Sequence, residues 1–325
     1  MTEYQVKLDK GVVPTKDTKI ILANTIKVPP IVWDWKPEQE EDAKQAFDKA
    51  FELGIPFYDT AEVYGDGESE REIKRFRERY SETDREQQVV ATKYFPHKER
   101  VDFPRVLMSA LKDSLDRLGM RHTDLYQIHA PIHPASIEVV ADALADAYEA
   151  GLVKTVGVSN YGTEEIERMH TALKKRGVQL ASNQICYSLM RRIPETSGLI
   201  KLCQERGVAI LAYSPLYMGM LTGKYPVDGP FPEGRKRRFE SFDKERLSNL
   251  LTALKKLADK YKKPQSAIAL NWVMAKGAIP IAGARTASHV EQNYTALDFL
   301  ISEDEVAELD KWSFEGENNK EWQHG

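Results

Sequence analysis

The chain has 325 residues, of which 42% are hydrophobic, so it is long enough to bury a sizeable core. Its 46 Lys and Arg residues nearly balance its 50 Asp and Glu residues, which gives a net charge of −4. This balance argues against nucleic acid or an anionic membrane as the main partner and indicates a partner bound in a local site.

The two cysteines, Cys186 and Cys203, lie in apolar surroundings without a CxxC spacing. That pattern argues against a disulfide framework, and no cluster of residues has the spacing of metal ligands. The first residues, MTEYQVKLDKG, include an acid at position 3 and no apolar core, so they do not resemble a signal peptide. The longest apolar runs are too short to span a bilayer. We therefore expect a cytoplasmic protein with no metal site.

Short apolar runs alternate with amphipathic helical patterns along the chain. The first 26 residues contain YQVKLDKG and TKIILAN, which predict a β-hairpin capping one end of the fold. The predicted strands that follow are residues 30–33 (PIVW), 56–58, 89–92 (VVAT), 125–128 (LYQI), 155–158 (TVGV), 180–185, 208–212 (VAILA) and 279–282. The predicted helices include residues 104–118, 137–149, 164–175 and 247–261.

Eight units of strand followed by helix predict a parallel sheet with helical crossovers. The strands are continuous apolar runs, as strands covered on both faces should be. No Pro- or Ser-rich linker divides the chain, so we expect one domain over residues 1–325, a (β/α)8 TIM barrel. A Rossmann sheet would show GxGxxG after its first strand, and nothing similar follows residue 33. Residues 213–242 predict a long loop at the C-terminal face, of the kind that forms a lid or binding loop.

Polar side chains follow three neighbouring strands, at the barrel end where chemistry takes place. FYDTAEVYG places Asp59 and Tyr64 after the second strand, VVATKYFP places Lys93 after the third, and LYQIHAP places His129 after the fourth. Each has an ordinary alternative, as a turn residue, a lysine that reaches solvent or a hydrogen-bonded histidine. Turn chemistry does not readily explain all four at one rim.

The four side chains also form a plausible catalytic group. A free phenol has a pKa near ~10 and is a poor acid at neutral pH. An ammonium about 4 Å away, at an effective dielectric near ~20, contributes ~4 kcal/mol, or roughly three pKa units, which brings Tyr64 towards the range of a general acid. In this hypothesis Asp59 keeps Lys93 charged and fixed, and a neutral His129 orients a substrate oxygen.

This group suits the protonation of a carbonyl oxygen as it becomes an alkoxide. Something must attack the carbonyl carbon, and the chain shows no Ser or Cys nucleophile paired with a base and no metal ligand set. A hydride from a nicotinamide fits, because the loops after strands seven and eight of this barrel usually bind phosphate. Here they contain YSPL, GMLTGK and GART, and Thr286 would cap a helix that faces an anion. GMLTGK is one residue short of a P-loop and lacks Ser or Thr after the Lys, which argues against an NTPase.

Six segments, in chain order, together resemble the aldo-keto reductases: DTAEVYGDGESE, ATK, IHAP, VGVSN, AYSPL and IPIAGART. The resemblance spans residues from about 30 to 293 and implies a (β/α)8 barrel that reduces aldehydes and ketones to alcohols with NADPH, which becomes NADP+. It implies a catalytic tetrad of Asp59, Tyr64, Lys93 and His129, with Tyr64 as proton donor. The cofactor-binding residues that it implies are Ser159, Asn160, Gln184, Tyr213, Ser214, Leu216, Gly219, Leu221, Lys224, Gly283, Arg285, Gln292 and Asn293.

The sequence departs from the family at two places. WDW at residues 33–35 replaces a Gly-rich turn after the first strand, and His289 stands near a position that is often Arg. We expect Arg285 or Lys224 to supply the charge that favours NADPH over NADH.

The expected substrate is a small carbonyl compound in an aromatic, apolar pocket. The substrate-binding residues that we expect are Trp33, Tyr94 and His129. An alternative is a nicotinamide-binding regulatory subunit, because some members of this superfamily are channel β-subunits that sense redox state. A barrel hydrolase or isomerase would need paired carboxylates or metal ligands, which this rim lacks. The sequence leaves the oligomeric state open.

Overall fold

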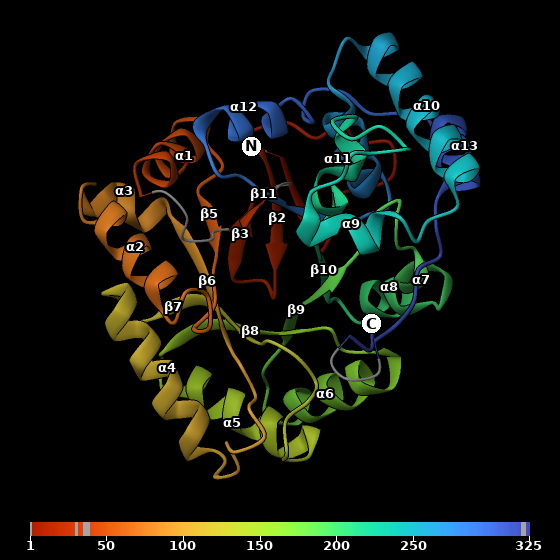
Figure 1. Ribbon diagram of the computed structural model, residues 1–325. Coiled ribbons are helices and arrows are strands. Elements are labelled where there is room, and N and C mark those ends of the chain that lie inside the picture. Colours follow the sequence, from red (N-terminus) through yellow and green to blue (C-terminus); the bar gives the residue numbers. More distant parts are fainter. Residues whose placement is uncertain (1, 30–31, 35–39, 320–322) are drawn as a thin grey trace.

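The computed structural model of the protein describes residues 2–29, 32–34, 40–319 and 323–325. Eight parallel strands close into a barrel in the order β10-β11-β4-β5-β6-β7-β8-β9, and helices surround it (Figure 1). The predicted (β/α)8 barrel is therefore confirmed. Within the described ranges, no helix is long and apolar enough to cross a membrane.

The barrel strands lie close to their predicted positions. They are β4 (Val32–Asp34), β5 (Phe57–Asp59), β6 (Val89–Tyr94), β7 (Thr123–Ile128), β8 (Val153–Ser159), β9 (Leu180–Cys186), β10 (Ala209–Tyr213) and β11 (Ile279–Gly283). Residues 30 and 31 of the first predicted strand lie outside the described residues. Because β6 extends to Tyr94, Lys93 lies within this strand rather than after it.

The four predicted helices correspond to α4 (Arg105–Leu118), α5 (Ile137–Glu149), α6 (Thr163–Lys175) and α10 (Lys244–Tyr261). The remaining helices are α1 (Glu40–Glu52), α2 (Glu68–Arg77), α3 (Glu82–Gln87), α7 (Ile193–Thr196), α8 (Leu199–Glu205), α9 (Glu233–Phe239), α11 (Gln265–Ala275), α12 (Ala287–Tyr294) and α13 (Glu303–Trp312).

The N-terminal residues form a small sheet of β1 (Thr2–Gln5), β2 (Thr18–Leu22) and β3 (Ile26–Val28). The predicted hairpin is present and consists of β2 and β3, whereas β1 joins β2 in parallel. Lys19 Nζ donates to Gly54 O at 3.3 Å, just before β5, and so this sheet covers the N-terminal end of the barrel.

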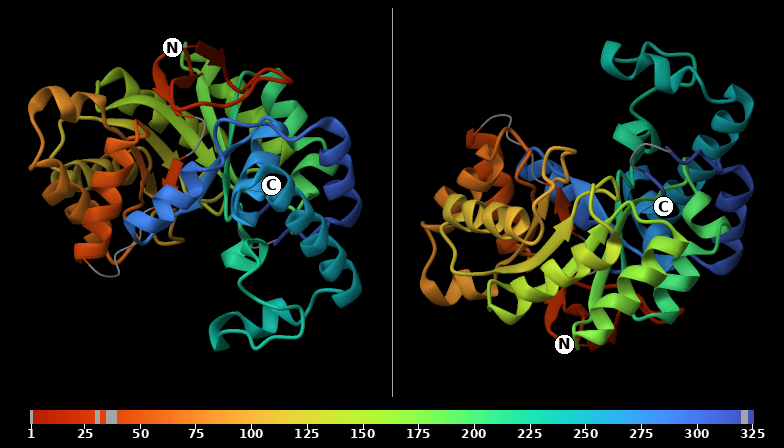
Figure 2. Two further views of the ribbon diagram at one scale, coloured as in Figure 1. Left: turned by 90° about the horizontal axis from the view of Figure 1, so that it is seen from above. Right: turned by 90° about the horizontal axis from the view of Figure 1, so that it is seen from below.

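The expected long loop after β10 contains a 3₁₀ segment (Tyr217–Thr222) and helix α9. It folds on a small aromatic cluster, in which the Phe239 ring lies 5.6 Å from Tyr225 and 5.4 Å from Phe231. In both views of Figure 2 this segment lies at the opposite end of the molecule from the N-terminal sheet. It therefore stands at the end where the polar rim was predicted.

Alternation along β5 places neighbouring side chains on opposite faces. Tyr58 points out to α1, where its ring stacks on Phe47 with centroids 3.9 Å apart and its hydroxyl donates to Phe47 O at 3.1 Å. Both side chains are fully buried. Asp59, the next residue, consequently points into the barrel.

Replacing Phe47 with Ala should lower the free energy of unfolding by about 3–5 kcal/mol, because it leaves a cavity against Tyr58. Urea unfolding followed by circular dichroism measures this change. Val139→Ala on the surface of α5, where Val139 is 43% exposed, is the control and should change it by about 0.5 kcal/mol or less. Similar values for the two variants would contradict the packing described for α1.

Candidate active site

A buried ion pair lies at the centre of the C-terminal rim. Lys93 Nζ is 2.5 Å from Asp59 Oδ2, and the two side chains are 0% and 1% exposed. Lys93 also donates to Thr60 O at 2.8 Å. A buried pair of this kind is held by its geometry and by further hydrogen bonds, because removing either charge leaves the other uncompensated.

The second oxygen of Asp59 is bound by two glutamines inside the barrel. Gln184 Nε2 donates to Asp59 Oδ1 at 2.9 Å, and Gln127 Nε2 lies 3.4 Å from the same atom. Gln184 was expected to bind cofactor, and in the structure its side-chain amide donates to the carboxylate of Asp59. Gln127 was not predicted, although it lies two residues before His129 on the same strand face and is the polar residue in an otherwise apolar run.

Tyr64 and His129 lie together above this pair. Lys93 Nζ is 5.0 Å from the centroid of the Tyr64 ring, and the Tyr64 and His129 rings meet edge to face at 5.7 Å. The structure therefore brings together all four predicted catalytic side chains, which come from β5, β6, β7 and their loops.

His129 is neutral in this environment. Burial and the nearby Lys93 charge lower the pKa of its imidazole from 6.5 to about 3. Its Nδ1 is buried and has no hydrogen-bond partner among the residues that the structure describes. A neutral ring beside Tyr64 can hold a polar group of a bound molecule without bringing in a second positive charge.

Ser159, Asn160 and Tyr213 continue the rim at the ends of β8 and β10. Ser159 Oγ donates to Gln184 O at 2.8 Å, and Asn160 Nδ2 donates to His129 O at 3.1 Å. Asn160 Oδ1 accepts from Tyr213 OH at 2.9 Å. Two residues with positive φ, Asn160 (66°) and Ser214 (54°), turn the chain at this point. The hydrogen-bonded group places amide and phenol side chains beside the tetrad.

The expected phosphate loop follows Tyr213. Ser214, Leu216 and Gly219 are partly exposed at its start, and Gly219 has a φ of 92°. Leu221 is fully buried and its amide donates to Leu216 O, so its side chain belongs to the core. Lys224 is exposed. Backbone groups of this loop and the ammonium group of Lys224 are therefore accessible at the surface.

The expected adenosine end lies between β11 and α12. Gly283, Arg285 and Gln292 are exposed, whereas Asn293 is buried and its Nδ2 lies 3.4 Å from Gly283 O. Thr286 caps α12, its Oγ1 accepting from His289 N at 3.3 Å, as the sequence suggested. A Cβ added at Gly283 would meet no atom within 4 Å, so this backbone is open to a ligand.

The predicted substrate-binding residues Tyr94 and Trp33 are not seen at the rim beside His129 in the described residues. Tyr94 is fully buried and packs against Phe103, with ring centroids 5.9 Å apart. It neighbours Lys93 on β6, and so strand alternation turns it out of the barrel. The ring of the next residue, Phe95, lies 5.5 Å from that of His129. Only the backbone of Trp33 is described, in β4, and Trp35 lies outside the described residues.

The C-terminal residues also reach this rim, which the sequence did not suggest. Gln323 Nε2 donates to Tyr213 OH at 2.6 Å, and the amide of Gly325 donates to Asn160 O at 3.2 Å. Arg191 is buried after β9 and donates to Cys186 O and Gly325 O, both at 2.6 Å. The segment that follows α13 is thereby fixed beside the amide and phenol groups.

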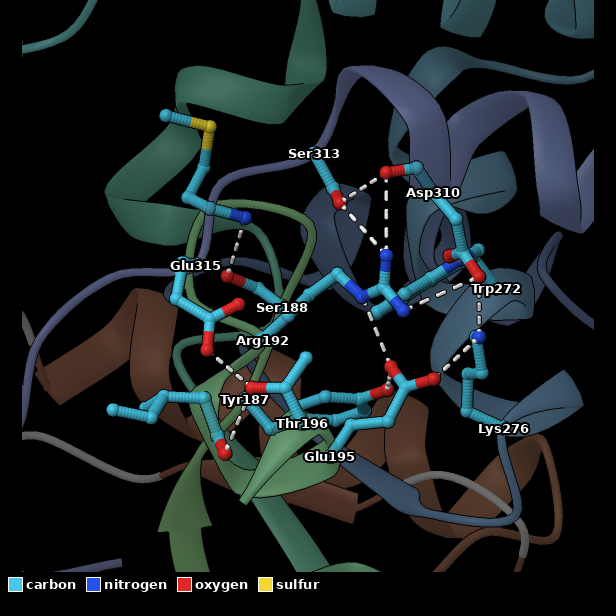
Figure 3. Close-up of polar contacts among 12 residues, drawn as sticks. Tyr187, Ser188, Arg192, Glu195, Thr196, Trp272, Lys276, Asp310, Ser313 and Glu315 are labelled. Atoms are coloured by element: carbon cyan, nitrogen blue, oxygen red, sulfur yellow. Dashed lines mark hydrogen bonds and ion pairs between the residues drawn. The ribbon is translucent and has the colours of Figure 1, made fainter. Parts of the chain in front are cut away.

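A charged network links α13, after which this segment begins, to α7 and to the end of α11 (Figure 3). Glu195 accepts from Arg192 Nε at 2.9 Å and from Lys276 Nζ at 2.7 Å, and Asp310 accepts from Lys276 at 2.5 Å. Two positive and two negative groups thus balance one another. Arg192 Nη1 also binds Ser313 Oγ at 3.1 Å, where the chain leaves α13.

Comparisons with known proteins agree on the protein family. The sequence profile of the Aldo/keto reductase family matches residues 31–313. The chain is similar to pyridoxal reductase, chloroplastic, from Arabidopsis thaliana, with 36% identity over 289 residues. The aligned region covers 86% of this chain and 79% of that protein. It is similar to the structure of the glycerol dehydrogenase from Gluconobacter oxydans (TM-score 0.80, 25% identity, covering 93% of this chain and 98% of that one). It is also similar to the Bombyx mori aldo-keto reductase in complex with NADP (TM-score 0.73, 25% identity, 94% and 95%).

The low pKa of His129 predicts how stability depends on pH. The unfolded chain takes up a proton on this residue below pH 6.5, whereas the folded protein does so only near pH 3. The wild-type protein should therefore lose stability as pH falls from 6.5 towards 3, and His129→Gln should lose less over the same window. Urea unfolding of both proteins at several pH values measures the difference, and parallel pH dependences would contradict a neutral, buried imidazole.

Proposed function

The chain belongs to the aldo/keto reductase family, and on this premise we propose that it reduces an aldehyde or ketone to an alcohol with NADPH. The observation that carries the proposal is the buried Asp59–Lys93 pair beneath Tyr64. An ammonium held against a phenol ring in a site of low dielectric stabilises the phenolate that remains after proton transfer.

Each member of the tetrad has one role in this proposal. Tyr64 donates its proton to the carbonyl oxygen as that oxygen becomes an alkoxide. Lys93 stabilises the phenolate by charge, and Asp59 compensates the buried ammonium. His129, neutral at physiological pH, holds the carbonyl oxygen beside the Tyr64 hydroxyl.

The rim fits a nicotinamide dinucleotide. Ser159, Asn160 and Tyr213 would hold the nicotinamide end, and the open backbone at Gly283 with Arg285 would hold the adenosine phosphate. The bound cofactor supplies the hydride that attacks the carbonyl carbon. NADPH is favoured because the relative from Bombyx mori is described as a complex with NADP.

We infer that the substrate carries an aromatic or apolar group next to its carbonyl. The support is Phe95, whose ring lies beside His129, together with pyridoxal reductase among the relatives. A reducing, cytoplasmic setting is inferred from the two cysteines, which are both free and buried.

Tyr64→Phe should lower kcat about 10²–10⁴-fold, because it removes the proton donor and preserves the ring. The Kd for NADPH should change by about twofold or less, since the hydroxyl acts on the carbonyl oxygen. Absorbance at the NADPH band, with a panel of aryl and alkyl aldehydes that includes pyridoxal, gives kcat, and fluorescence titration gives Kd.

Tyr148→Phe on the surface, where Tyr148 is 40% exposed, is the matched control and should keep the wild-type rate. A full rate in Tyr64→Phe would exclude Tyr64 as the acid. If the wild-type protein binds NADPH but reduces no carbonyl, the nicotinamide-binding regulatory alternative is favoured.

A further inference from the structure

A second ion pair lies at the same rim and is not part of the tetrad. Glu62 precedes Tyr64 by two residues in the loop after β5, and Arg100 lies in the loop between β6 and α4. The contact is bidentate, with Nη1 of Arg100 2.6 Å from Oε1 of Glu62 and Nη2 3.2 Å from Oε2. The Glu62 side chain is 8% exposed and that of Arg100 is 27% exposed, so this pair is much better shielded than an ordinary surface pair.

Both side chains also bind the backbone of Phe95. Its amide donates to Glu62 Oε1 at 2.6 Å, and its carbonyl accepts from Arg100 Nη1 at 3.1 Å. The Glu62 amide in turn donates to Lys93 O at 3.3 Å. The loop that carries Tyr64 is therefore fastened to the end of β6 through main chain and side chain together. We call Glu62, Arg100 and the Phe95 backbone the rim clamp.

The rim clamp also adjoins His129, which follows strand β7. His129 N donates to Tyr94 O at 2.8 Å, and the Phe95 ring lies 5.5 Å from the imidazole. Burial acts to lower the pKa of Arg100, but the Glu62 carboxylate more than offsets this and raises it above the ordinary value, so Arg100 stays charged.

The loop that follows Tyr64 is a tight turn. The three residues after Tyr64, which are Gly65, Asp66 and Gly67, all have positive φ, at 59°, 53° and 78°. A hydrogen bond of 2.7 Å between the Thr60 and Ser69 hydroxyls joins the two ends of this loop. Two of these residues are glycines, which adopt positive φ readily, and within the loop the Ser69 amide donates to Tyr64 O at 3.2 Å. The rim clamp adds contacts between the arm of the loop next to Tyr64 and the end of β6.

We propose that Glu62 and Arg100 are positioning residues, which set the Tyr64 phenol relative to Lys93 and His129 for proton transfer. The inference rests on the proposed function, in which Tyr64 is the acid. A displacement of about 1 Å in a catalytic group costs on the order of 10²-fold in rate, so loss of the rim clamp should appear in kcat. The nicotinamide end, which Ser159, Asn160 and Tyr213 on β8 and β10 would hold, should bind as before.

The test combines Glu62→Ala, Arg100→Met and the double variant, with Glu62→Gln and Arg100→Lys as conservative changes. Glu62→Ala and Arg100→Met should each lower kcat roughly 10–10²-fold, with the Kd for NADPH within about twofold of wild type. The double variant should be about as slow as Glu62→Ala alone, since both single changes open the same contact. Arg100→Lys should recover part of the rate because it keeps the ion pair.

Glu138→Ala is the matched control, because Glu138 forms a bidentate pair with Arg168 at 2.9 and 3.0 Å on the exposed surface of α5 and α6. It should leave kcat unchanged. Wild-type kcat in Glu62→Ala, additive losses in the double variant, or equal losses of cofactor affinity and rate would overturn the inference. If Glu62→Ala does not fold, Glu62→Gln carries the same measurements. A wild-type protein that reduces no carbonyl would overturn the proposed function itself, and a defect confined to the variants would not.

Discussion

The Lys93–Asp59 ion pair constrains the arrangement of the strands at the C-terminal end of the barrel, because burying either charge without the other is energetically unfavourable. Desolvating a single buried ion costs several kcal/mol, and the cost is offset only when its partner and further hydrogen bonds are in place. Here the other contacts come from Thr60 O and from Gln184 on β9. The register that pairs Asp59 with Ala91 then places Lys93 two residues further along the same face of β6. The sheet must close with this register for the charges to meet.

Residues deeper in the barrel also support the ion pair, through Gln127. Gln127, which approaches Asp59, also accepts from Ser182 Oγ at 3.3 Å. The strand between them, β8, carries Gly157, where a Cβ would lie 2.4 Å from Ser182 Oγ and 3.1 Å from the Gln127 side chain. A larger residue would press on both groups that lead to Asp59. The small residue in VGVSN is therefore part of the support of the ion pair.

Much of the fold and the site could be predicted because strand burial and strand ends leave local signals. VVATK and LYQIH each show a core strand with a polar group at or near its end, and this pattern predicted that Lys93 and His129 lie at one rim. The outward position of Tyr94 was not predicted, because it follows only from the strand alternation that the inward position of Lys93 imposes. The contact of Gln323 with Tyr213 spans 110 positions of the chain, and no local pattern encodes a pairing of that range. The same holds for Glu62 with Arg100, whose loop has no periodic signal to place it.

Phe95 has a consequence for how the protein can diversify. Its amide and its carbonyl are both held by charged side chains, while its ring stands next to His129. The backbone contacts do not depend on the identity of the side chain at this position. With the proposed function, mutation at this position would change the shape of the substrate site and leave the proposed catalytic groups in place, so that selection could act on specificity and on chemistry separately.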